Sequence, residues 1–528
     1  MPAGLGRLRL CPRLLREPRQ GRLSADQMRT VIRQASHLAT PEALVEHLQA
    51  EPGVVLLRSS LFDPVHGRYS FVAARPFLTF RSVGARCEIC ETRPDQDRSS
   101  LTGLTCSVRF GNPWELLDLL LRRFDVPEAA RLEAPAGGCF GFWGYDLKNF
   151  VEPKLRRCAK VDLPLPDCHV GFYDSLVMFD HLLGQTWIIS TGLCADGSRS
   201  ASRADEQFEF WERQLACAQA LGALGPDRMG APGLPTVESN FTRAAFIEAV
   251  HRAKQYIRAG DIYQVNLAQR LAVAWPWSGW ALFKRLAVAS PAPFGAYLHC
   301  GEFELAGASP ELFLRIRGNL VQTRPIKGTR PVTGHAAQDA ELARELLTST
   351  KERAELIMIT DLLRNDLGKI CTFGSVRVPE LVRLERFAQV QHLVATVEGQ
   401  LRPELSHVNT LAACFPGGSI TGAPKFRAME IIDELEPVTR GPYTGALGYI
   451  GFNKQSQLSI IIRTAICCNQ TAYFHVGAGI VADSVPEAEY DETMAKAGGF
   501  LKALAPVYTA SCRLNAAGAA TGADSSRG

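Results

Sequence analysis

The chain has 528 residues, of which 46% are hydrophobic and 21% are charged, and its formal net charge is +4. This composition is typical of a water-soluble globular protein with more than one core, and the charge is too small to indicate a nucleic-acid partner. Because no apolar run approaches the ~20 residues that cross a bilayer, and no apolar signal segment opens the chain, we expect a cytoplasmic protein with no membrane partner.

The N-terminal region is predicted to be a disordered extension followed by an α+β unit. Residues 1–24 carry six arginines and one acid, a composition that suits disorder and also occurs in transit peptides. Folded sequence is expected to begin near Thr40, which can cap a helix that has Pro41 in its first turn. Strand-like runs and an amphipathic helix follow (54–57, 69–73 and 113–124).

Fifteen cysteines are scattered through the chain, and Cys87 and Cys90 form the only Cys-x-x-Cys pair. A zinc site needs a second pair or histidines at a matching spacing, and neither follows. We therefore expect free or buried thiols, no bound zinc and no disulfide framework.

Glycine and proline mark how the chain is divided. The glycines of 137–144 stand among bulky aromatic residues, which indicates a backbone packed closely against another layer. Residues 162–167 form an extended, proline-rich linker into a strand at 176–179. The polar segment 222–235 is the best domain boundary, so we predict one region over 25–235, a second over 240–508 and a disordered tail over 509–528.

The second region opens with a helix capped by Thr242 and ended by Gly260. Residues 262–273 then alternate as a strand, with Tyr263, Val265 and Leu267 on an apolar face. Gln264, Asn266 and Arg270 lie on the opposite face, which is available to line a cavity.

Lys327 and Glu311 are candidate catalytic groups. Lys327 lies between an apolar residue and a glycine, where desolvation would lower the pKa of its amine and leave a nucleophilic lone pair. The alternative is an ordinary solvated lysine at a turn. Glu311 follows a tight turn and precedes Leu312 and Phe313, so it is either a protonated general acid or an exposed glutamate.

Two glutamate pairs are candidate metal ligands. Glu352 and Glu355 lie three residues apart on a predicted helix at 349–367, and Glu489 and Glu492 repeat the spacing. Such pairs are common on solvated helices, but two converging pairs would form the all-oxygen site that Mg²⁺ prefers.

Two glycine-rich segments are candidate anion-binding loops. Residues 415–425 open a helix, and Thr421 and Lys425 add a hydroxyl and a charge to the free backbone N–H groups. Ala423-Pro424 stands where a nucleotide P-loop requires Lys-Ser or Lys-Thr, so a carboxylate is the expected ligand. The second run, 477–479, precedes no helix, which excludes a dinucleotide fingerprint.

The ordered set of motifs resembles the chorismate-utilising enzymes from about Val54 to Leu504. The matching passages are Gly260-Asp261-Ile262-Tyr263-Gln264-Val265-Asn266-Leu267, Ser309-Pro310-Glu311, Pro325-Ile326-Lys327-Gly328-Thr329, Asp361-Leu362-Leu363-Arg364-Asn365-Asp366-Leu367-Gly368 and Gly418-Ser419-Ile420-Thr421-Gly422-Ala423-Pro424-Lys425. The resemblance implies a large α/β (α+β) fold with β-sheets sandwiched between helices, and an active site in the C-terminal half.

The resemblance also implies roles for single residues. Lys327 would attack chorismate while Glu311 acts as acid and His392 lines the active site. The four glutamates (Glu352, Glu355, Glu489 and Glu492) would hold Mg²⁺. The residues expected to bind substrate are Gln264, Thr421, Gly422, Lys425, Tyr449, Arg463, Gly477, Ala478 and Gly479.

Within the family, Lys327 and Gln264 together resemble the members that aminate chorismate at C4. Members that aminate C2 have alanine in place of Lys327, and isochorismate-forming members have lysine in place of Gln264. Ammonia would come from a separate glutamine amidotransferase subunit, because no part of the chain resembles one. The alternatives are a C2-aminating subunit and a non-catalytic scaffold that binds the amidotransferase.

One departure concerns the tryptophan site that some members have between their sheets. Leu57-Arg58-Ser59-Ser60 matches one part of it, but Ser290-Pro291-Ala292-Pro293 has serine where the family motif has asparagine. This departure argues against tryptophan binding.

Overall fold

The computed structural model describes residues 30–59, 67–92, 104–221, 236–386 and 390–504. The two segments that are predicted to be disordered, 1–24 and 509–528, lie outside these residues. No helix in the described part of the chain is long and apolar enough to span a membrane.

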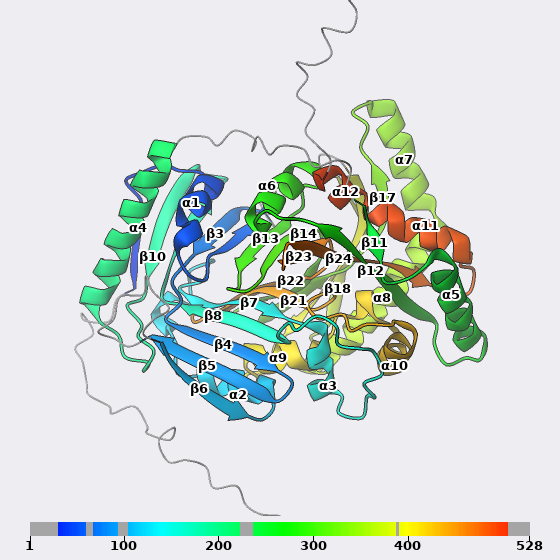
Figure 1. Cartoon of the computed structure of the whole chain (residues 1–528), viewed down its shortest axis with the longest axis horizontal. Coiled ribbons are helices and arrows are strands. Elements are labelled where there is room, and N and C mark those ends of the chain that lie inside the picture. The colour runs from blue at the N-terminus through cyan, green and yellow to red at the C-terminus, as the bar shows by residue number, and fades with distance from the viewer. Residues whose placement is uncertain (1–29, 60–66, 93–103, 222–235, 387–389, 505–528) are drawn as a thin grey trace, which may run out of the picture.

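Two large sheets with antiparallel strand pairing form the centre of the molecule (Figure 1). The first sheet runs β1 (Val31–Gln34), β10 (Gln185–Ser190), β9 (Ser175–Asp180), β3 (Tyr69–Ala73), β2 (Val55–Arg58), β13 (Phe294–His299), β14 (Glu304–Ser309), β23 (Thr464–Cys468), β24 (Thr471–Ile480), β12 (Gln264–Ala274) and β11 (Glu238–Ser239), with β20 (Gly422–Ala423) paired to β12. The second runs β17 (Ile326–Pro331), β19 (Val390–Gln400), β16 (Leu320–Arg324), β15 (Leu312–Arg317), β22 (Gln455–Ile460), β21 (Ala446–Gly451), β7 (Gly138–Trp143), β8 (Cys168–Tyr173), β4 (Leu78–Val83), β5 (Arg86–Thr92) and β6 (Leu104–Phe110), with β18 (Arg377–Arg386) paired to β19.

Each sheet is continuous between the two predicted regions. In the first sheet β2 pairs with β13, and in the second β7 pairs with β21. The main apolar core draws residues from both sheets, including Phe71 and Leu298 of the first and Phe140 and Leu458 of the second. The site therefore rests on one packed structure to which both halves of the chain contribute.

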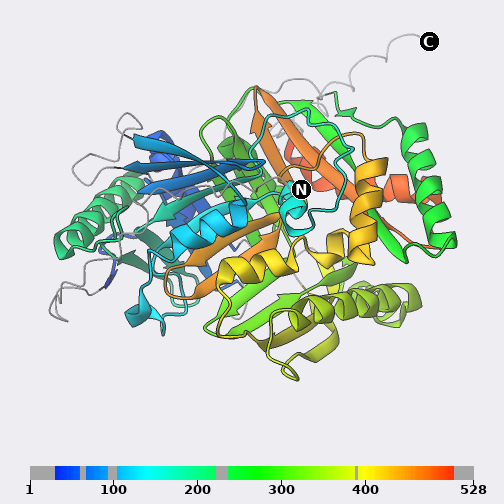
Figure 2. The same cartoon turned by 90° about the horizontal axis from the view of Figure 1, so that it is seen from below.

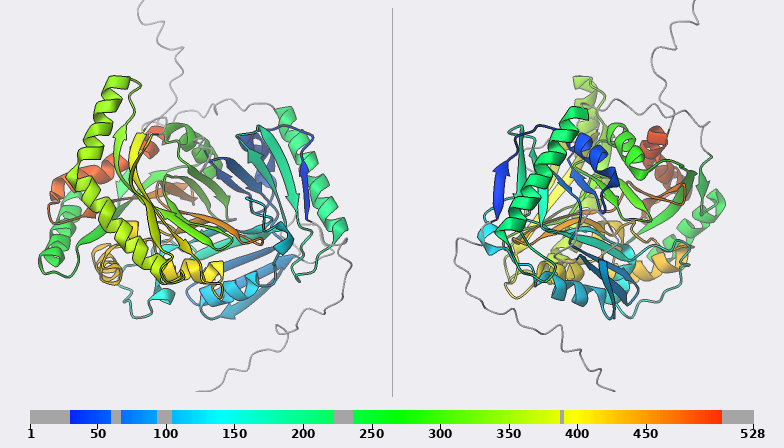
Figure 3. Two further views of the ribbon diagram at one scale, coloured as in Figure 1. Left: turned by 180° about the vertical axis from the view of Figure 1, so that it is seen from behind. Right: turned by 60° about the vertical axis from the view of Figure 1, so that its left-hand side comes forward.

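Helices cover the two sheets, so the predicted architecture of sheets sandwiched between helices is confirmed. On the first sheet lie α1 (Pro41–His47), α4 (Ala201–Leu221), α6 (Gly279–Ala289), α12 (Gly498–Leu504), α5 (Arg243–Arg258), α10 (Lys425–Leu435) and α11 (Pro486–Lys496). On or beside the second lie α2 (Pro113–Leu121), α3 (Lys148–Val151), α7 (Ala336–Thr348), α8 (Thr350–Gly368) and α9 (His407–Cys414). From below, α2 and α9 lie side by side (Figure 2), and from behind, α7 projects beyond the sheets (Figure 3).

Local sequence signals placed many of these elements correctly. Thr40 and Thr242 each accept a hydrogen bond from a backbone N–H of the helix that follows, as the capping pattern predicts. Ser349, expected inside the next predicted helix, caps α8 in the same way. The close contact of Gly141 in the glycine-rich strand β7 is with the neighbouring strand β8 of the same sheet and not with another layer, because a Cβ there would lie 2.1 Å from the His169 carbonyl oxygen. The first described strand, β1, begins before the predicted start at Thr40.

Two predictions are wrong, one about the burial of Tyr263 and one about the thiol of Cys90. Tyr263 does not belong to the core: β12 begins one residue later, and the side chain is 73% exposed. Cys90 is not a free thiol, since it forms a disulfide with Cys106 across the β5–β6 pair, where the two residues lie directly opposite each other. Cysteine spacing alone does not show which residues of two strands lie opposite each other, so this disulfide could not be predicted from the sequence.

Candidate active site

The candidate site lies where an edge of the second sheet approaches the first sheet. Lys327 is on β17, whereas Gln264 and Gly479 are on β12 and β24. A methyl group placed on Gly479 would lie 2.5 Å from the Gln264 amide nitrogen and 3.9 Å from Lys327 Nζ. The structure therefore brings together three residues that lie far apart in the sequence.

Lys327 is largely withdrawn from solvent and faces an acidic helix. Its side chain is 18% exposed, and Nζ lies 3.9 Å from Glu355 Oε2 on α8. The next residue, Gly328, has a φ of +67°, and a Cβ there would come within 2.6 Å of Leu346 Cδ1 and 3.1 Å of Glu352 Oε2. A glycine is needed at this point for the strand to pass so close to α7 and α8.

Glu311 is a buried carboxyl directed into the same site. Its residue is 6% exposed, and burial raises its pKa to about 7, against the opposing effects of the Ser419 hydroxyl and the Lys327 charge. The apolar surroundings predicted from Leu312 and Phe313 are confirmed, since both are buried. A carboxyl with this pKa is partly protonated at neutral pH, as a general acid must be.

The two glutamate pairs lie on different helices near Lys327. Burial raises the pKa of Glu355, and the negative charges of Glu352 and Glu492 add to the effect while Lys327 opposes it. Burial also acts to raise the pKa of Glu492, but Lys496, whose Nζ is 2.8 Å from Glu492 Oε1, lowers it overall. Burial raises the pKa of Glu489. The helices thus direct carboxylates from both pairs at one region.

The carboxylates of the two glutamate pairs do not enclose a metal position by themselves. In the described ranges, the only trio of acidic, cysteine or histidine groups with ligand atoms within 4.8 Å of one another is Glu88, Cys90 and Cys106, whose cysteines form the disulfide. An open arrangement suits Mg²⁺, which usually takes one or two carboxylates and keeps several waters. Glu355 and Glu492 lie on different helices and are close enough for the charge of Glu492 to contribute to the raised pKa of Glu355.

His392 and Arg463 lie on another side of the site. His392 is 2% exposed, its Nδ1 is 2.9 Å from Thr329 Oγ1, and burial lowers its pKa to about 4, so its ring is neutral. Arg463 is close enough for its charge to contribute to that shift. Within the described part of the chain, the Arg463 side chain has no ion pair, and burial lowers its pKa. A desolvated guanidinium without a carboxylate partner is suited to an anionic ligand.

In the glycine-rich loop before α10, the predicted ligand groups of Thr421 and Lys425 form hydrogen bonds within the protein. The Thr421 hydroxyl donates to the carbonyls of Gly417 and Gly418 at 3.0 and 3.2 Å. Lys425 Nζ donates to Asp366 Oδ2 at 2.5 Å and to the Cys414 carbonyl at 3.0 Å. These contacts hold the loop against α8 and α9, and the group that points toward Glu311 is the Ser419 hydroxyl.

Gly422 has a backbone role in the same loop. Its φ is +146°, and a Cβ would lie 2.2 Å from the Gln264 carbonyl oxygen. This close contact lets β20 pair with β12 and holds the loop beside Gln264. The side chain of Gln264 is buried, and in the described structure its Oε1 has no hydrogen-bond donor.

The segment 477–479 presents backbone to the site on alternate residues of β24. Ala478 is fully buried in the core beneath α5 and α10, whereas Gly477 and Gly479 face the other way. A methyl group on Gly477 would lie 2.9 Å from the Tyr443 hydroxyl. The Gly477 carbonyl accepts a hydrogen bond from Lys496 Nζ at 2.8 Å.

The structure separates Tyr449 from this group and brings Tyr443 into it. Tyr449 is on β21 and packs between Phe71 and Phe140, at 5.6 and 5.5 Å between ring centroids. Tyr443 instead reaches Gly477 and hydrogen-bonds to Asn266. Sequence reasoning missed Tyr443 and Ser419 because nothing in the local pattern shows which of two nearby tyrosines, or which hydroxyl of a loop, faces a distant strand.

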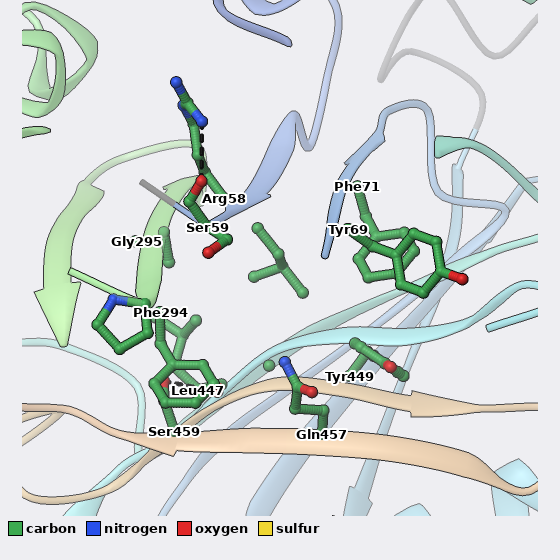
Figure 4. A pocket seen from close by; sticks show the side chains of 14 residues that line it. Arg58, Ser59, Tyr69, Phe71, Phe294, Gly295, Leu447, Tyr449, Gln457 and Ser459 are labelled. Carbon is green, nitrogen blue, oxygen red and sulfur yellow. Dashed lines mark hydrogen bonds between the residues drawn. The ribbon is translucent and has the colours of Figure 1, made fainter. Parts of the chain in front are cut away.

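Tyr449 lines a small cavity between the two sheets (Figure 4). Leu57, Arg58 and Ser59 border it from β2 and the residue after it, and Pro293 borders it from the segment before β13. These are the segments that resemble the tryptophan site of some relatives. Whether the serine substitution abolishes tryptophan binding stays a prediction.

A buried acid, a lysine, the carboxylates of two helices and a desolvated guanidinium thus lie together between the two sheets. The sequence pattern of the chorismate binding enzymes matches residues 90–502, and the chain belongs to this family. It is 37% identical over 473 residues to anthranilate synthase component 1 of Acetivibrio thermocellus, covering 88% of this chain and 93% of that protein. It is 38% identical over 454 residues to aminodeoxychorismate synthase component 1 of Escherichia coli K12, covering 86% and 93%.

A solved structure agrees with the fold. Anthranilate synthase component I from Streptococcus pneumoniae TIGR4 superposes with a TM-score of 0.68 and 30% identity, over 84% of this chain and 94% of that one. The predicted family and fold class are therefore confirmed.

Proposed function

We propose that this chain is component I of an aminodeoxychorismate synthase, which aminates chorismate at C4 to 4-amino-4-deoxychorismate on the way to 4-aminobenzoate and folate. The observation that carries the proposal is the placement of Lys327 between the buried acid Glu311 and the residues Gln264 and Gly479. Relatives of both the C4- and the C2-aminating kind have similar identity to the chain, so the choice between them depends on this lysine.

The proposed reaction has two displacement steps. The Lys327 amine forms a bond to C2 of the ring while the C4–O bond breaks, and Glu311 gives its proton to the departing hydroxyl, which leaves as water. Ammonia then forms a bond to C4, the ring double bonds shift back, and the C2–Nζ bond breaks. A lysine that occupies C2 during the first step directs nitrogen to C4.

Magnesium fits the carboxylates of α8 and α11. Glu355 and Glu492 would hold the ion, and Glu352 and Glu489 would assist through water. When bound, it would neutralise the ring carboxylate and withdraw electron density from the ring. The raised pKa of Glu355, to which neighbouring carboxylates contribute, is the observation that supports a cation at this point.

The remaining groups would bind and orient the substrate. Arg463 and the Tyr443 hydroxyl, with the backbone at Gly477 and Gly479, would bind the enolpyruvyl carboxylate, and Ser419 is placed to orient Glu311 and bind the ring carboxylate. His392, neutral because it is buried, would act as a hydrogen-bonding group. The ammonia would come from a separate glutamine amidotransferase subunit.

The test is product identification. Purified protein is incubated with chorismate, MgCl₂ and an ammonium salt, and the products are identified by mass spectrometry before and after the addition of aminodeoxychorismate lyase. We expect 4-amino-4-deoxychorismate, which the lyase converts to 4-aminobenzoate. Anthranilate would identify a C2-aminating enzyme, and unchanged chorismate would identify a non-catalytic scaffold, so either result overturns the proposal.

A further inference from the structure

Arg440 is one of the largest fully buried side chains in the described structure, at 2% exposure. It lies between α10 and β21, and its side chain makes five hydrogen bonds. Two of them go to the Glu436 carboxylate, at 2.9 and 2.6 Å. A buried guanidinium with this many partners fixes the relative positions of everything it contacts.

The other hydrogen bonds of Arg440 reach segments that carry site residues. Arg440 donates to the Asn266 carbonyl on β12 at 2.7 Å and to the Ile420 carbonyl, next to Ser419, at 3.1 Å. Glu436 extends the link, because it accepts a hydrogen bond from the backbone N–H of Ala268 at 2.9 Å. The ion pair thus joins the glycine-rich loop, the strand of Gln264 and the turn that leads into β21.

Arg440 also contacts Tyr443, together with His475 and Asn266. Its ring stacks on His475 with 4.7 Å between centroids and 8° between planes, and the Arg440 guanidinium lies 5.5 Å from the ring centroid. Its hydroxyl hydrogen-bonds to Asn266, whose side-chain amide also donates to the Ile420 carbonyl at 3.0 Å. The ring plane and the hydroxyl direction of Tyr443 are therefore set by Arg440, His475 and Asn266 together.

We propose that the Arg440–Glu436 ion pair is a positioning device that aligns Tyr443 and Ser419 for the carboxylates of the substrate. Arg440 is buried behind these residues, so it acts through them. The inference rests on the proposed function only in taking chorismate as the ligand of the site. It assigns to the segment that follows α10 the role of fixing the distance between the glycine-rich loop and β12.

The test separates alignment from stability. The double variant Glu436→Gln/Arg440→Met removes both charges and keeps an acceptor for Ala268, since replacing a buried ion pair with uncharged groups of similar size often preserves stability. We expect it to unfold near the wild-type temperature, while its KM and Kd for chorismate rise about 10- to 100-fold, the scale of effect that a small misplacement of binding groups has. Arg440→Lys keeps the charge but loses the planar fork, and we expect it to weaken chorismate binding in the same direction.

The matched control is another ion pair with a buried carboxylate. Arg68 donates to Asp180 on β9 at 2.6 Å, near the opposite end of the first sheet, and Arg68→Met/Asp180→Asn should leave the KM within about twofold of wild type. The inference is overturned if either Arg440 variant folds and binds chorismate with wild-type affinity, or if both fail to fold. Titration with chorismate and Mg²⁺ in the absence of ammonia measures affinity whichever product the enzyme makes, so an unexpected product would overturn the proposed function alone.

Discussion

Two clusters of buried charge lie within the same part of the molecule, and they differ in how well their charges are paired. Around Arg440, each charged group has close hydrogen-bond partners. Around Lys327, the ion contact with Glu355 is 3.9 Å long, and Gln264 Oε1 has no donor within the described residues. Unpaired buried charge costs stability. The difference indicates that the Arg440 cluster is scaffold and that the Lys327 cluster is completed by ligands.

The strongest test of this contrast is Lys327→Ala, with Lys327→Arg as its matched control. The alanine variant should lose C4 amination by at least ~10²-fold, because it lacks the nucleophile. The arginine variant keeps a long nitrogen-bearing side chain but has no usable lone pair, so we expect it to lose amination as well while still binding chorismate. Product formation followed by mass spectrometry gives the rate, and full activity of either variant would remove the covalent step from the mechanism.

Glu311→Gln should lower kcat by about 10²- to 10⁴-fold, since it removes the proton donor. In the wild type, the rate should fall as pH rises through about 7, because burial raises the pKa of Glu311 to about 7 and its acid form is lost above that value. A pH–rate profile checks this limb of the curve. A flat profile between pH 6 and 8, with chemistry limiting the rate, would exclude Glu311 as the acid.

The same variant has an opposite effect on stability. Since the folded-state pKa of Glu311 lies above its ordinary value of 4.5, the stability linked to its protonation is fully present below pH 4.5 and is lost as pH rises through about 7. Glu311→Gln should therefore be more stable than wild type at pH 8, by up to roughly 3 kcal/mol. Urea unfolding at pH 5 and pH 8 measures the difference, which should shrink at the lower pH.

Features that depend on residues adjacent in the chain could be predicted from the sequence. Helix caps at Thr40 and Thr242 are local signals, and the structure confirms them. The apolar neighbours of Glu311 in the chain left two alternatives open, a buried acid or an exposed glutamate, and the structure shows the buried one.

What could not be predicted depends on contacts between distant segments. Tyr443 and Ser419 face the site because β24 and Glu311 lie opposite them. Lys425 carries the charge of an anion-binding residue, yet it is turned to Asp366 on α8. The pairing of Cys90 with Cys106 required the register of β5 and β6. In each case the type of residue indicated the kind of contact it could make, but the fold determined which residue it contacts.

Arg463 offers an intermediate test, because its guanidinium is desolvated and has no ion pair with a described residue. Arg463→Met should raise the KM for chorismate by about 10- to 100-fold, the value of one or two charge-assisted hydrogen bonds. It should not destabilise the fold, since no buried acid loses its partner. An unchanged KM would show that the substrate carboxylates bind elsewhere.

The two tyrosines allow a matched comparison with a smaller expected effect. Tyr443→Phe removes the hydroxyl beside Gly477 and should raise the KM for chorismate by about 3- to 10-fold, the value of one hydrogen bond. Tyr449→Phe removes the hydroxyl of a residue that lines the cavity between the sheets (Figure 4), and we expect the KM to stay within about twofold. A larger effect at Tyr449 than at Tyr443 would restore the assignment made from the sequence.

Lys425→Met should have a small effect on chorismate binding and a large effect on the stability of the fold. Lys425 Nζ is already 2.5 Å from Asp366, a residue that is 2% exposed, so the substitution leaves a buried carboxylate with only the weaker Lys369 contact at 3.1 Å. Breaking a buried pair in this way typically costs about 3 kcal/mol of unfolding free energy. Denaturant unfolding should show this loss, while the KM measured on folded protein stays within about threefold of wild type. If the KM rises as much as it does for Arg463→Met, the Lys425 ammonium leaves Asp366 when chorismate binds. The glycine-rich loop that contains Lys425 would then belong to the Lys327 cluster, which ligands complete.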